Sequence, residues 1–217
     1  MVSMIILVMA EYMVDDSPLW YRASRSREHS GVAEATDLGL SASLRHDLQA
    51  WNDIFEQVRQ EVFDDRDGSS SVPSTSASPE LLEAHRVESF TLASRVQLEL
   101  GDDVHVWCGA GSGIDTLTES GTAVVLPNGR PGNDVEFFHN GKRDVRSARA
   151  ARAREGTAKA IVHWRALTER VETPFGDAGT RALGLRTAGR LQSDVGPHAQ
   201  VIFYAGASAP YQLDQFD

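Results

Sequence analysis

Short aliphatic runs alternate with longer stretches of helical periodicity along the chain. Met4–Ala10 is a continuous aliphatic run of strand length, which predicts a strand whose two faces are both covered. A first helix is expected with Ser41 as its N-cap. A second helix is expected with Ser78 as its N-cap, Pro79 at its first position and Gly101 as its stop. The apolar stripe of the first helix follows steps of three and four residues and consists of Leu44, Leu48, Trp51, Phe55, Val58 and Val62.

The second half of the chain follows the same order of elements with additions. A strand at Val104–Cys108 closes the first half, and Asn-Gly turn signals on both sides of Val135–Phe138 predict an added strand or hairpin in the second. Residues 143–172 follow a helical pattern, with Gly156 as a break or kink. The remaining expected elements are a strand at Thr122–Leu126, a helix around Thr180–Val195 that ends at Gly196, and a strand at Val201–Tyr204.

A short sequence pattern occurs twice. Ala93–Gly111 and Ala188–Gly206 align without a gap at a constant offset of 95 residues, and seven of the 19 positions are identical. Upstream, an offset of 113 residues relates Trp51, Glu56 and Val58 to Trp164, Glu169 and Val171. A repeat of this size is too long for a solenoid and indicates two tandem halves of one fold.

These patterns predict an α/β fold, with α+β as the alternative class, built from two tandem strand–helix–helix–strand repeats. Residues 1–110 would form the first repeat and residues 111–217 the second, with helices packed on a small sheet around a pseudo-twofold axis. Two independent small domains are the alternative, but the joining segment lacks the length and polarity of a free linker. We expect a flexible loop at residues 64–78 and a mobile tail after residue 208.

Charge divides the chain into unlike halves. Residues 1–110 hold 8 Arg, no Lys and 19 Asp or Glu, a formal charge of −11, whereas residues 111–217 have a formal charge of +1. An acidic first half would attract a basic partner and repel nucleic-acid backbones. Solubility alone is the other explanation of this charge.

The N-terminus and the single cysteine bear on the compartment. The opening apolar run has no Lys or Arg before it and ends at Glu11, so we expect neither an export signal nor a membrane segment. Because Cys108 is the only cysteine, an internal disulfide and a thiolate-rich zinc site are excluded. The thiol is expected to be buried and unreactive. These features predict a cytoplasmic protein.

No local motif predicts catalysis, a metal or a cofactor. Gly109–Gly113 lacks the spacing of phosphate-binding and serine-nucleophile loops, and we interpret it as a connector between the halves. His105 and Cys108 would point to opposite faces of a strand and could not form a local pair. The seven histidines are scattered without the spacing of metal ligands. We therefore expect no cofactor and no metal site, and we assign no catalytic residue.

Two groups of residues are candidate binding sites. Residues retained in both repeats could line a groove at the junction of the two halves: Trp51, Glu56, Arg95, Trp164, Glu169 and Arg190. A glutamate–arginine ion pair between the helices of each half is the structural alternative. The second group is a basic patch on an expected helix over residues 143–154, formed by Arg143, Arg146, Arg149 and Arg152. This patch could contact a nucleic-acid backbone, remain in solvent or dock on the acidic first half.

Several short segments of the first half resemble small uncharacterised bacterial proteins. They are Met9-Ala10-Glu11-Tyr12, Pro18-Leu19-Trp20, Leu38-Gly39-Leu40-Ser41, Leu44, Trp51, and Leu92-Ala93 through Leu100-Gly101. The resemblance covers roughly residues 4–108. It implies an opening strand, a Pro-Leu-Trp loop, two helices and a closing strand, and no activity is attached to it.

The leading hypothesis is a non-enzymatic interaction or regulatory protein, of the inhibitor or immunity type, whose acidic half binds a basic protein partner. An enzyme with its site at the junction of the repeats is the alternative. Weak nucleic-acid binding through the arginine-rich segment is the third hypothesis. No membrane partner is expected, and the sequence does not indicate an oligomeric state.

Overall fold

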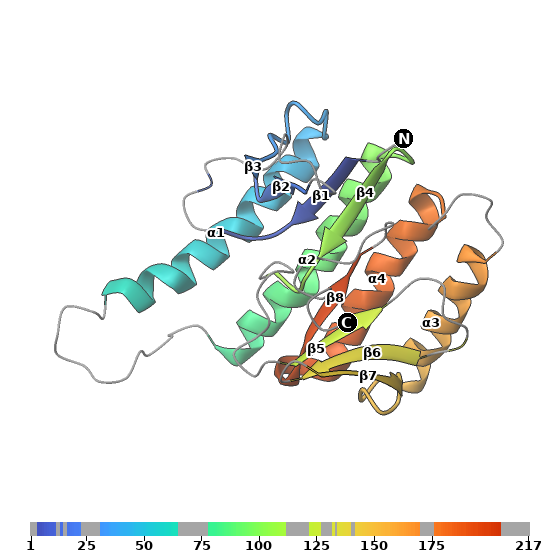
Figure 1. Cartoon of the computed structure of the whole chain (residues 1–217). Coiled ribbons are helices and arrows are strands. Elements are labelled where there is room, and N and C mark those ends of the chain that lie inside the picture. Colours follow the sequence, from blue (N-terminus) through green and yellow to red (C-terminus); the bar gives the residue numbers. More distant parts are fainter. Residues whose placement is uncertain are drawn as a thin grey trace.

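Four α-helices lie against one face of an eight-stranded sheet, so the molecule has two layers (Figure 1). This computed structural model describes residues 4–11, 14, 17–22, 31–64, 78–111, 122–126, 132, 134–139, 142–169 and 176–204. Parallel and antiparallel strands are mixed in the sheet, and the helices lie on one side of it. This arrangement confirms a layered fold of helices on a sheet, of the α+β class that was the expected alternative.

Both halves of the chain have the element order strand–strand–strand–helix–helix–strand. The first half consists of β1 (Met4–Val8), β2 (Leu19–Tyr21), β3 (Gly31–Val32), α1 (Ala42–Asp64), α2 (Pro79–Leu100) and β4 (Val104–Cys108). The second half consists of β5 (Thr122–Leu126), β6 (Asp134–His139), β7 (Lys142–Ser147), α3 (Glu155–Thr168), α4 (Ala178–Val195), a 3-10 turn (Gly196–His198) and β8 (Gln200–Phe203).

The strands form one continuous sheet in the order β3-β2-β1-β4-β8-β5-β6-β7. β1 pairs in parallel with β4, and β5 pairs in parallel with β8. β4 and β8 meet antiparallel at the centre, where Cys108 lies opposite Phe203. The two short antiparallel strands of each half continue outward from this centre, which leaves β3 at one edge and β7 at the other.

The main hydrophobic core lies between the sheet and the helices. In β1, Ile6 and Val8 face the helices, whereas Ile5 and Leu7 belong to a second buried cluster on the other face. The continuous aliphatic run therefore has both faces covered, as its sequence predicts. The closest helix pair is α2 with α4, and α1 and α3 flank this pair on opposite sides (Figure 1).

The helix boundaries follow the local signals in the sequence. The Ser78 hydroxyl accepts a hydrogen bond from the Leu81 amide, Pro79 begins α2, and Gly101 ends it with a positive φ of 74°. The Ser41 hydroxyl accepts from the Leu44 amide at the start of α1. These caps satisfy backbone groups that a helix end leaves without partners, so the predictions of both N-termini are confirmed.

The prediction of a helix over residues 143–154 is wrong. Lys142–Ser147 form strand β7, which pairs antiparallel with β6 along its full length, and α3 begins only at Glu155. Gly156 lies in the first turn of α3 and does not break it. The added hairpin around Val135–Phe138 is confirmed as β6 and β7. The segment that contains Leu19, expected as a loop, is strand β2.

Several expectations fall outside the described residues: the loop between α1 and α2, the segment after Gly111 that connects the halves, and the tail. Among the helices that the structure describes, none has the length and apolar content needed to cross a membrane.

Candidate partner-binding surface

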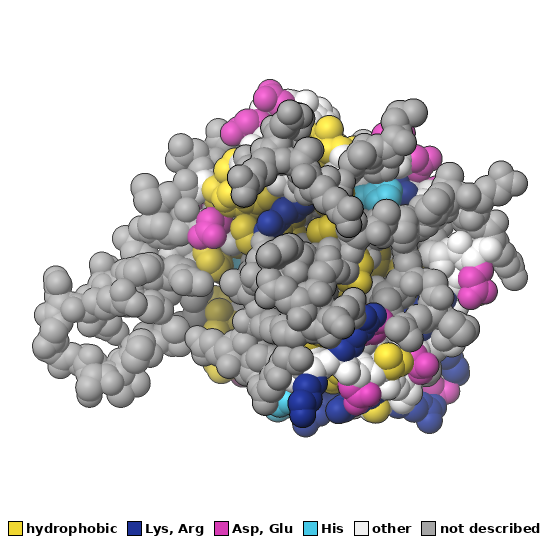
Figure 2. Space-filling model, viewed as in Figure 1, with side chains coloured by type: hydrophobic (Ala, Val, Ile, Leu, Met, Phe, Trp, Pro, Cys, Tyr) yellow, Lys and Arg dark blue, Asp and Glu magenta, His cyan; other side chains and the backbone are white. Residues whose placement is uncertain are grey.

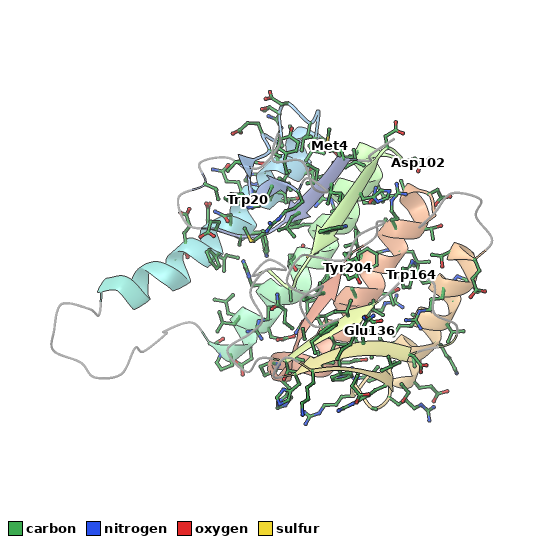
Figure 3. All side chains as sticks on the ribbon, in the orientation of Figure 1. Met4, Trp20, Asp102, Glu136, Trp164 and Tyr204 are labelled. Carbon is green, nitrogen blue, oxygen red and sulfur yellow. The ribbon has the colours of Figure 1, made fainter. Side chains whose placement is uncertain are left out.

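Acidic side chains gather at one end of the first half, and we call this group the acidic end. It consists of Glu34, Asp37, Glu99, Asp102 and Asp103, all exposed. The first two lie in the turn between β3 and α1, and the others lie at the C-terminal end of α2 and in the turn that leads to β4. Acidic side chains are visible along the upper rim of the molecule in Figure 2, and Asp102 is labelled there in Figure 3.

Hydrogen bonds hold the segments of the acidic end together. The Glu99 carboxylate accepts from the Ser41 amide at 2.7 Å and from its hydroxyl at 2.8 Å, which joins the end of α2 to the start of α1. The Asp102 carboxylate accepts from the Ala178 amide at 2.5 Å and so caps the N-terminus of α4. Each of these carboxylates stabilises a helix N-terminus, where backbone N–H groups lack partners.

The other three carboxylates of the acidic end have no such role. Among the residues that the structure describes, no side-chain hydrogen bond or ion pair involves Glu34, Asp37 or Asp103. Asp103 also lies just past the C-terminal end of α2, where the helix dipole is already negative. Helix stability does not explain an acid at this position, but the Asp103 charge acts on the nearby buried Arg181. Among the described residues, Glu34 and Asp37 have no such neighbour and leave negative charge to attract a basic surface.

Arg181 of α4 fixes the second half against the base of the acidic end. Its side chain is buried and donates to the carbonyl oxygens of Gly101 at 3.2 Å and Asp102 at 2.9 Å. It also donates to Gln97 Oε1 at 3.2 Å and to the Gly176 carbonyl at 2.5 Å. Burial lowers the pKa of this guanidinium, and the nearby aspartates oppose that shift. The turn that carries Asp102 is therefore held rigidly by the second half.

The two tryptophans of the predicted junction groove occupy separate helix pairs. Trp51 is buried between α1 and α2, and its Nε1 donates to the His85 carbonyl at 3.0 Å. Trp164 is buried between α3 and α4, and its Nε1 donates to the Thr180 carbonyl, also at 3.0 Å. Because α1 and α3 lie on opposite flanks of the central pair, the structure does not bring the two indoles together (Figure 1).

The charged residues of that predicted groove are also spread over the helix layer. Arg95 pairs with Asp47 at 2.6 Å rather than with Glu56, so the predicted glutamate–arginine pair is wrong in the first half. Glu56 accepts a hydrogen bond from Asn52 at 3.4 Å. Arg190 on α4 and Glu169 at the end of α3 are exposed. A binding role for these six residues stays a prediction.

The predicted basic patch lies at the edge of the sheet. Arg143 and Arg146 are on β7, and Arg149 and Arg152 are in the turn before α3, all exposed. Arg143 pairs with the buried carboxylate of Glu136 at 2.7 Å. The patch therefore lies at and beside β7, at the end of the described strand order opposite to β3.

Two reactive residue types are held in structural positions. The Cys108 thiol is buried, as expected, and its Sγ lies 3.3 Å from the Ser89 hydroxyl. Burial raises the pKa of this thiol to about 11, which disfavours the reactive thiolate. His85 stacks on the Trp51 indole with ring centroids 4.7 Å apart, and its Nε2 donates to the Trp51 carbonyl. Burial lowers the pKa of His85 to about 4. Within the described part of the chain, no group of histidine, cysteine and carboxylate side chains could hold a metal ion.

Sequence reasoning found the acidic excess but not its place. The acidic end unites residues from 34 to 103, and only the packing of α1 on α2 brings them together. No sequence signal locates this group, because at the offset of 113 residues the segments 34–41 and 147–154 share a single identical position, Ala35 and Ala148.

Residues 4–108 match a family model described as Serratia CdiI immunity protein-like. The matched region starts with β1 and ends with β4, so it covers the complete first half and the whole acidic end. No curated protein and no solved structure matches the chain. The family match supports an immunity-type role, in which a protein acts by binding another protein.

Proposed function

We propose that this chain is an immunity-type protein that neutralises a toxin by binding it, and that the acidic end contacts a basic surface of that toxin. The observation that carries the proposal is the family match over residues 4–108, because the same residues contain the acidic excess. A single buried cysteine suits a reducing compartment, so we place the complex in the cytoplasm.

The charge distribution supports the acidic end as the contact surface. Glu34, Asp37 and Asp103 are exposed, and they do not have to break an ion pair within the described chain before they meet a partner. Their segments are fixed by the hydrogen bonds of Glu99 and Arg181. A charged surface that is already ordered loses little conformational freedom on binding, and complementary charge speeds association.

The placement of the residues gives no support to an enzyme at the junction of the halves. Trp51 and Trp164 are buried in different helix pairs, and Arg95 is neutralised by Asp47. Catalysis requires reacting groups in one pocket within hydrogen-bond reach of each other.

The proposal is tested by co-purification followed by a growth assay. The tagged full chain is purified from its own host at about 50 mM salt, and the captured protein is identified and expressed alone and with this chain. We expect a basic protein that stops growth when expressed alone and allows growth when this chain is co-expressed. Capture should fall steeply as salt rises towards about 300 mM, because screening shortens the range of charge attraction.

Two outcomes would contradict the proposal. One is a captured protein whose expression does not affect growth, because such a partner is not a toxin. The other is growth that the chain fails to restore although both proteins are present and folded, which would remove neutralisation. Restoration of growth by a complex that is insensitive to salt would retain the immunity role and remove the acidic end as its contact surface.

A further inference from the structure

The turn that precedes the first helix has the same backbone structure in both halves. In the first half, the amides of Leu38, Gly39 and Leu40 donate to the carbonyls of Glu34, Thr36 and Ala35. In the second half, the amides of Ala151, Arg152 and Ala153 donate to the carbonyls of Ser147, Arg149 and Ala148. The distances are 2.9–3.2 Å, and every pair is related by the offset of 113 residues. Gly39 and Arg152 share a positive φ, 73° and 66°.

A glutamine bridge at the end of α2 is also repeated at the end of α4. Gln97 Nε2 donates to the Gly101 and Val104 carbonyls, and its Oε1 accepts from the Val106 amide. Gln192 makes the corresponding bonds, at an offset of 95 residues, to Gly196, Ala199 and Val201. Both glutamines are fully buried. Equivalent buried bonds, with strand pairings symmetric about β4 and β8, relate the two halves in three dimensions.

Charge is the main difference between the corresponding turns. Residues 34–41 contain Glu34 and Asp37 and no basic residue, whereas residues 147–154 contain Arg149, Arg152 and Arg154 and no acidic residue. The amide that begins each helix is held in the same way, by the Glu99 carboxylate at Ser41 and by the Asp194 carboxylate at Arg154, both at 2.7 Å. The backbone is thus conserved between the halves while the outward charge is reversed.

Strand β7 extends this basic turn to the last strand of the described sheet. All six of its residues are exposed, and β6 is the strand that pairs with it at the end of the described sheet. An edge strand presents backbone donors and acceptors to a further strand. Arg146 pairs with Asp144 of the same strand and Arg143 pairs with Glu136, both at 2.7 Å. Lys142, Arg143 and Arg146 outnumber the single acid of β7, so the strand keeps a net positive charge that favours an acidic strand as its partner.

We infer that residues 122–203 are a second copy of the unit formed by residues 4–108, and that its basic edge binds an extended acidic segment of a partner protein along β7. The basic edge is defined as Lys142, Arg143, Arg146, Arg149 and Arg152. It is distinct from the acidic end, which consists of the turn after β3 and the turn that leads to the central strand β4. This inference goes beyond the proposed immunity role and does not depend on it.

An acidic protein segment suits this surface better than a nucleic acid. The two aromatic rings near the basic edge are covered by cations: the Arg146 guanidinium lies 4.9 Å from the Phe137 ring and the Arg143 guanidinium 5.9 Å from the Phe138 ring. Bases therefore have no free ring there on which to stack. The formal charge of −10 on the whole chain also repels a long polyanion more than a short acidic strand.

Nuclear magnetic resonance titration of the full chain tests the inference with three probes. The first is a peptide of about eight residues that alternates Glu and Thr, enough to cover β7, the second alternates Lys and Thr, and the third is a single-stranded oligothymidylate. We expect the Glu-Thr peptide to shift the β7 amides, slow their hydrogen exchange and bind less tightly as salt rises. The Lys-Thr peptide and the oligothymidylate should leave β7 unchanged.

Two variants locate the site. Arg146→Glu with Arg149→Glu should weaken the affinity for the Glu-Thr peptide at least about fivefold, because both side chains would then repel the peptide. The matched control, Lys159→Glu with Arg186→Glu, makes the same change in net charge on the helix face and should bind as the natural chain does. Equal loss in both variants, oligothymidylate binding at β7, or shifts confined to other elements would overturn the acidic-segment site.

An exchange of turns tests whether the second half is a copy of the first. Residues 147–154 are replaced by the sequence of residues 34–41, which puts a glycine at the position of Arg152 and a serine at that of Arg154. If the two segments are equivalent, the chimera should fold, melt within a few degrees of the natural chain and no longer bind the Glu-Thr peptide. A chimera that unfolds would contradict equivalence, since shared backbone geometry is the basis of the exchange.

Discussion

At the scale of single residues, backbone conformation and burial determine how substitutions and pH change the stability of the chain. Arg152 has a φ of 66°, a region that side chains rarely adopt, while the corresponding Gly39 has a φ of 73° without a steric cost. His85 is neutral in the folded chain because burial lowers its pKa to about 4. Both features lead to measurable changes in stability.

Arg152→Gly should raise the free energy of unfolding by about 0.5–1 kcal/mol, because glycine adopts a positive φ without strain. Gly39→Ala should lower it by about 1 kcal/mol for the converse reason. Both values come from urea unfolding. Arg152→Ala is the control, and a gain equal to that of glycine would show that charge rather than backbone conformation is responsible.

His85 should make the stability of the chain depend on pH. Its pKa is 6.5 in the unfolded reference and about 4 in the folded chain, so protons bind preferentially to the unfolded form between these values. The free energy of unfolding should therefore fall as the pH drops from about 6.5 to about 4, and His85 should contribute no change above that window. His85→Gln, which cannot be protonated, should show a flatter profile there. An unchanged slope would contradict the assignment.

At the scale of helices and strands, close packing of α4 holds the second half together. A Cβ at Gly184 would lie 2.6 Å from Phe203 Cε2 and 2.7 Å from Trp164 Cε2, so glycine allows α4 to approach both β8 and α3. At Gly156 in α3, by contrast, a Cβ would meet open space. The two glycines therefore have opposite expected effects.

Gly184→Ala should destabilise the chain by about 1–3 kcal/mol, since neither buried ring can move freely. Gly156→Ala should leave stability unchanged or raise it by up to about 1 kcal/mol, because alanine favours the helix. Thermal unfolding of both variants checks the pair. Equal small effects would mean that α4 packs less tightly than the distances indicate.

Arg181 gives a prediction about how the halves are joined. Arg181→Leu would leave the carbonyls of Gly101 and Asp102 without their buried donor, and the free energy of unfolding should fall by about 3 kcal/mol or more. Arg186→Leu on the exposed face of the same helix should change it by less than about 0.5 kcal/mol. Similar losses in both variants would contradict a special role for Arg181.

Elements with strong local signals could be predicted from the sequence. Caps such as Ser78 and aliphatic runs such as Val104–Cys108 predict their own structure, because the relevant contacts lie within a few residues. β7 was mistaken for helix because arginines at steps of three separated by alanines also suit a helix, and its pairing with β6 decides the outcome. β3 has two residues and exists through pairing with β2, which no local pattern reveals.

At the scale of the whole molecule, the two halves place opposite charges at different sites: the acidic end at the turns before α1 and β4, and the basic edge at β7 and the turn before α3. The sequence predicts the imbalance of charge but not its location, because the acidic end is assembled from the turn before α1 and the end of α2. The six residues of the predicted junction groove were selected for recurrence in both halves. In Trp51 and Trp164, recurrence reflects a shared packing role at a helix–helix contact.

The central claim is that the acidic end of an immunity-type unit binds a basic toxin. The direct measurement is the affinity, by isothermal titration calorimetry, of the captured partner for two charge-reversed variants of equal net charge. Glu34→Lys with Asp37→Lys should weaken binding at least about tenfold, with a reduced dependence on salt. Asp53→Lys with Glu80→Lys, which reverses exposed acids away from the acidic end, should bind as the natural chain does. Unchanged affinity in the first variant, or the same loss in both, would contradict the account.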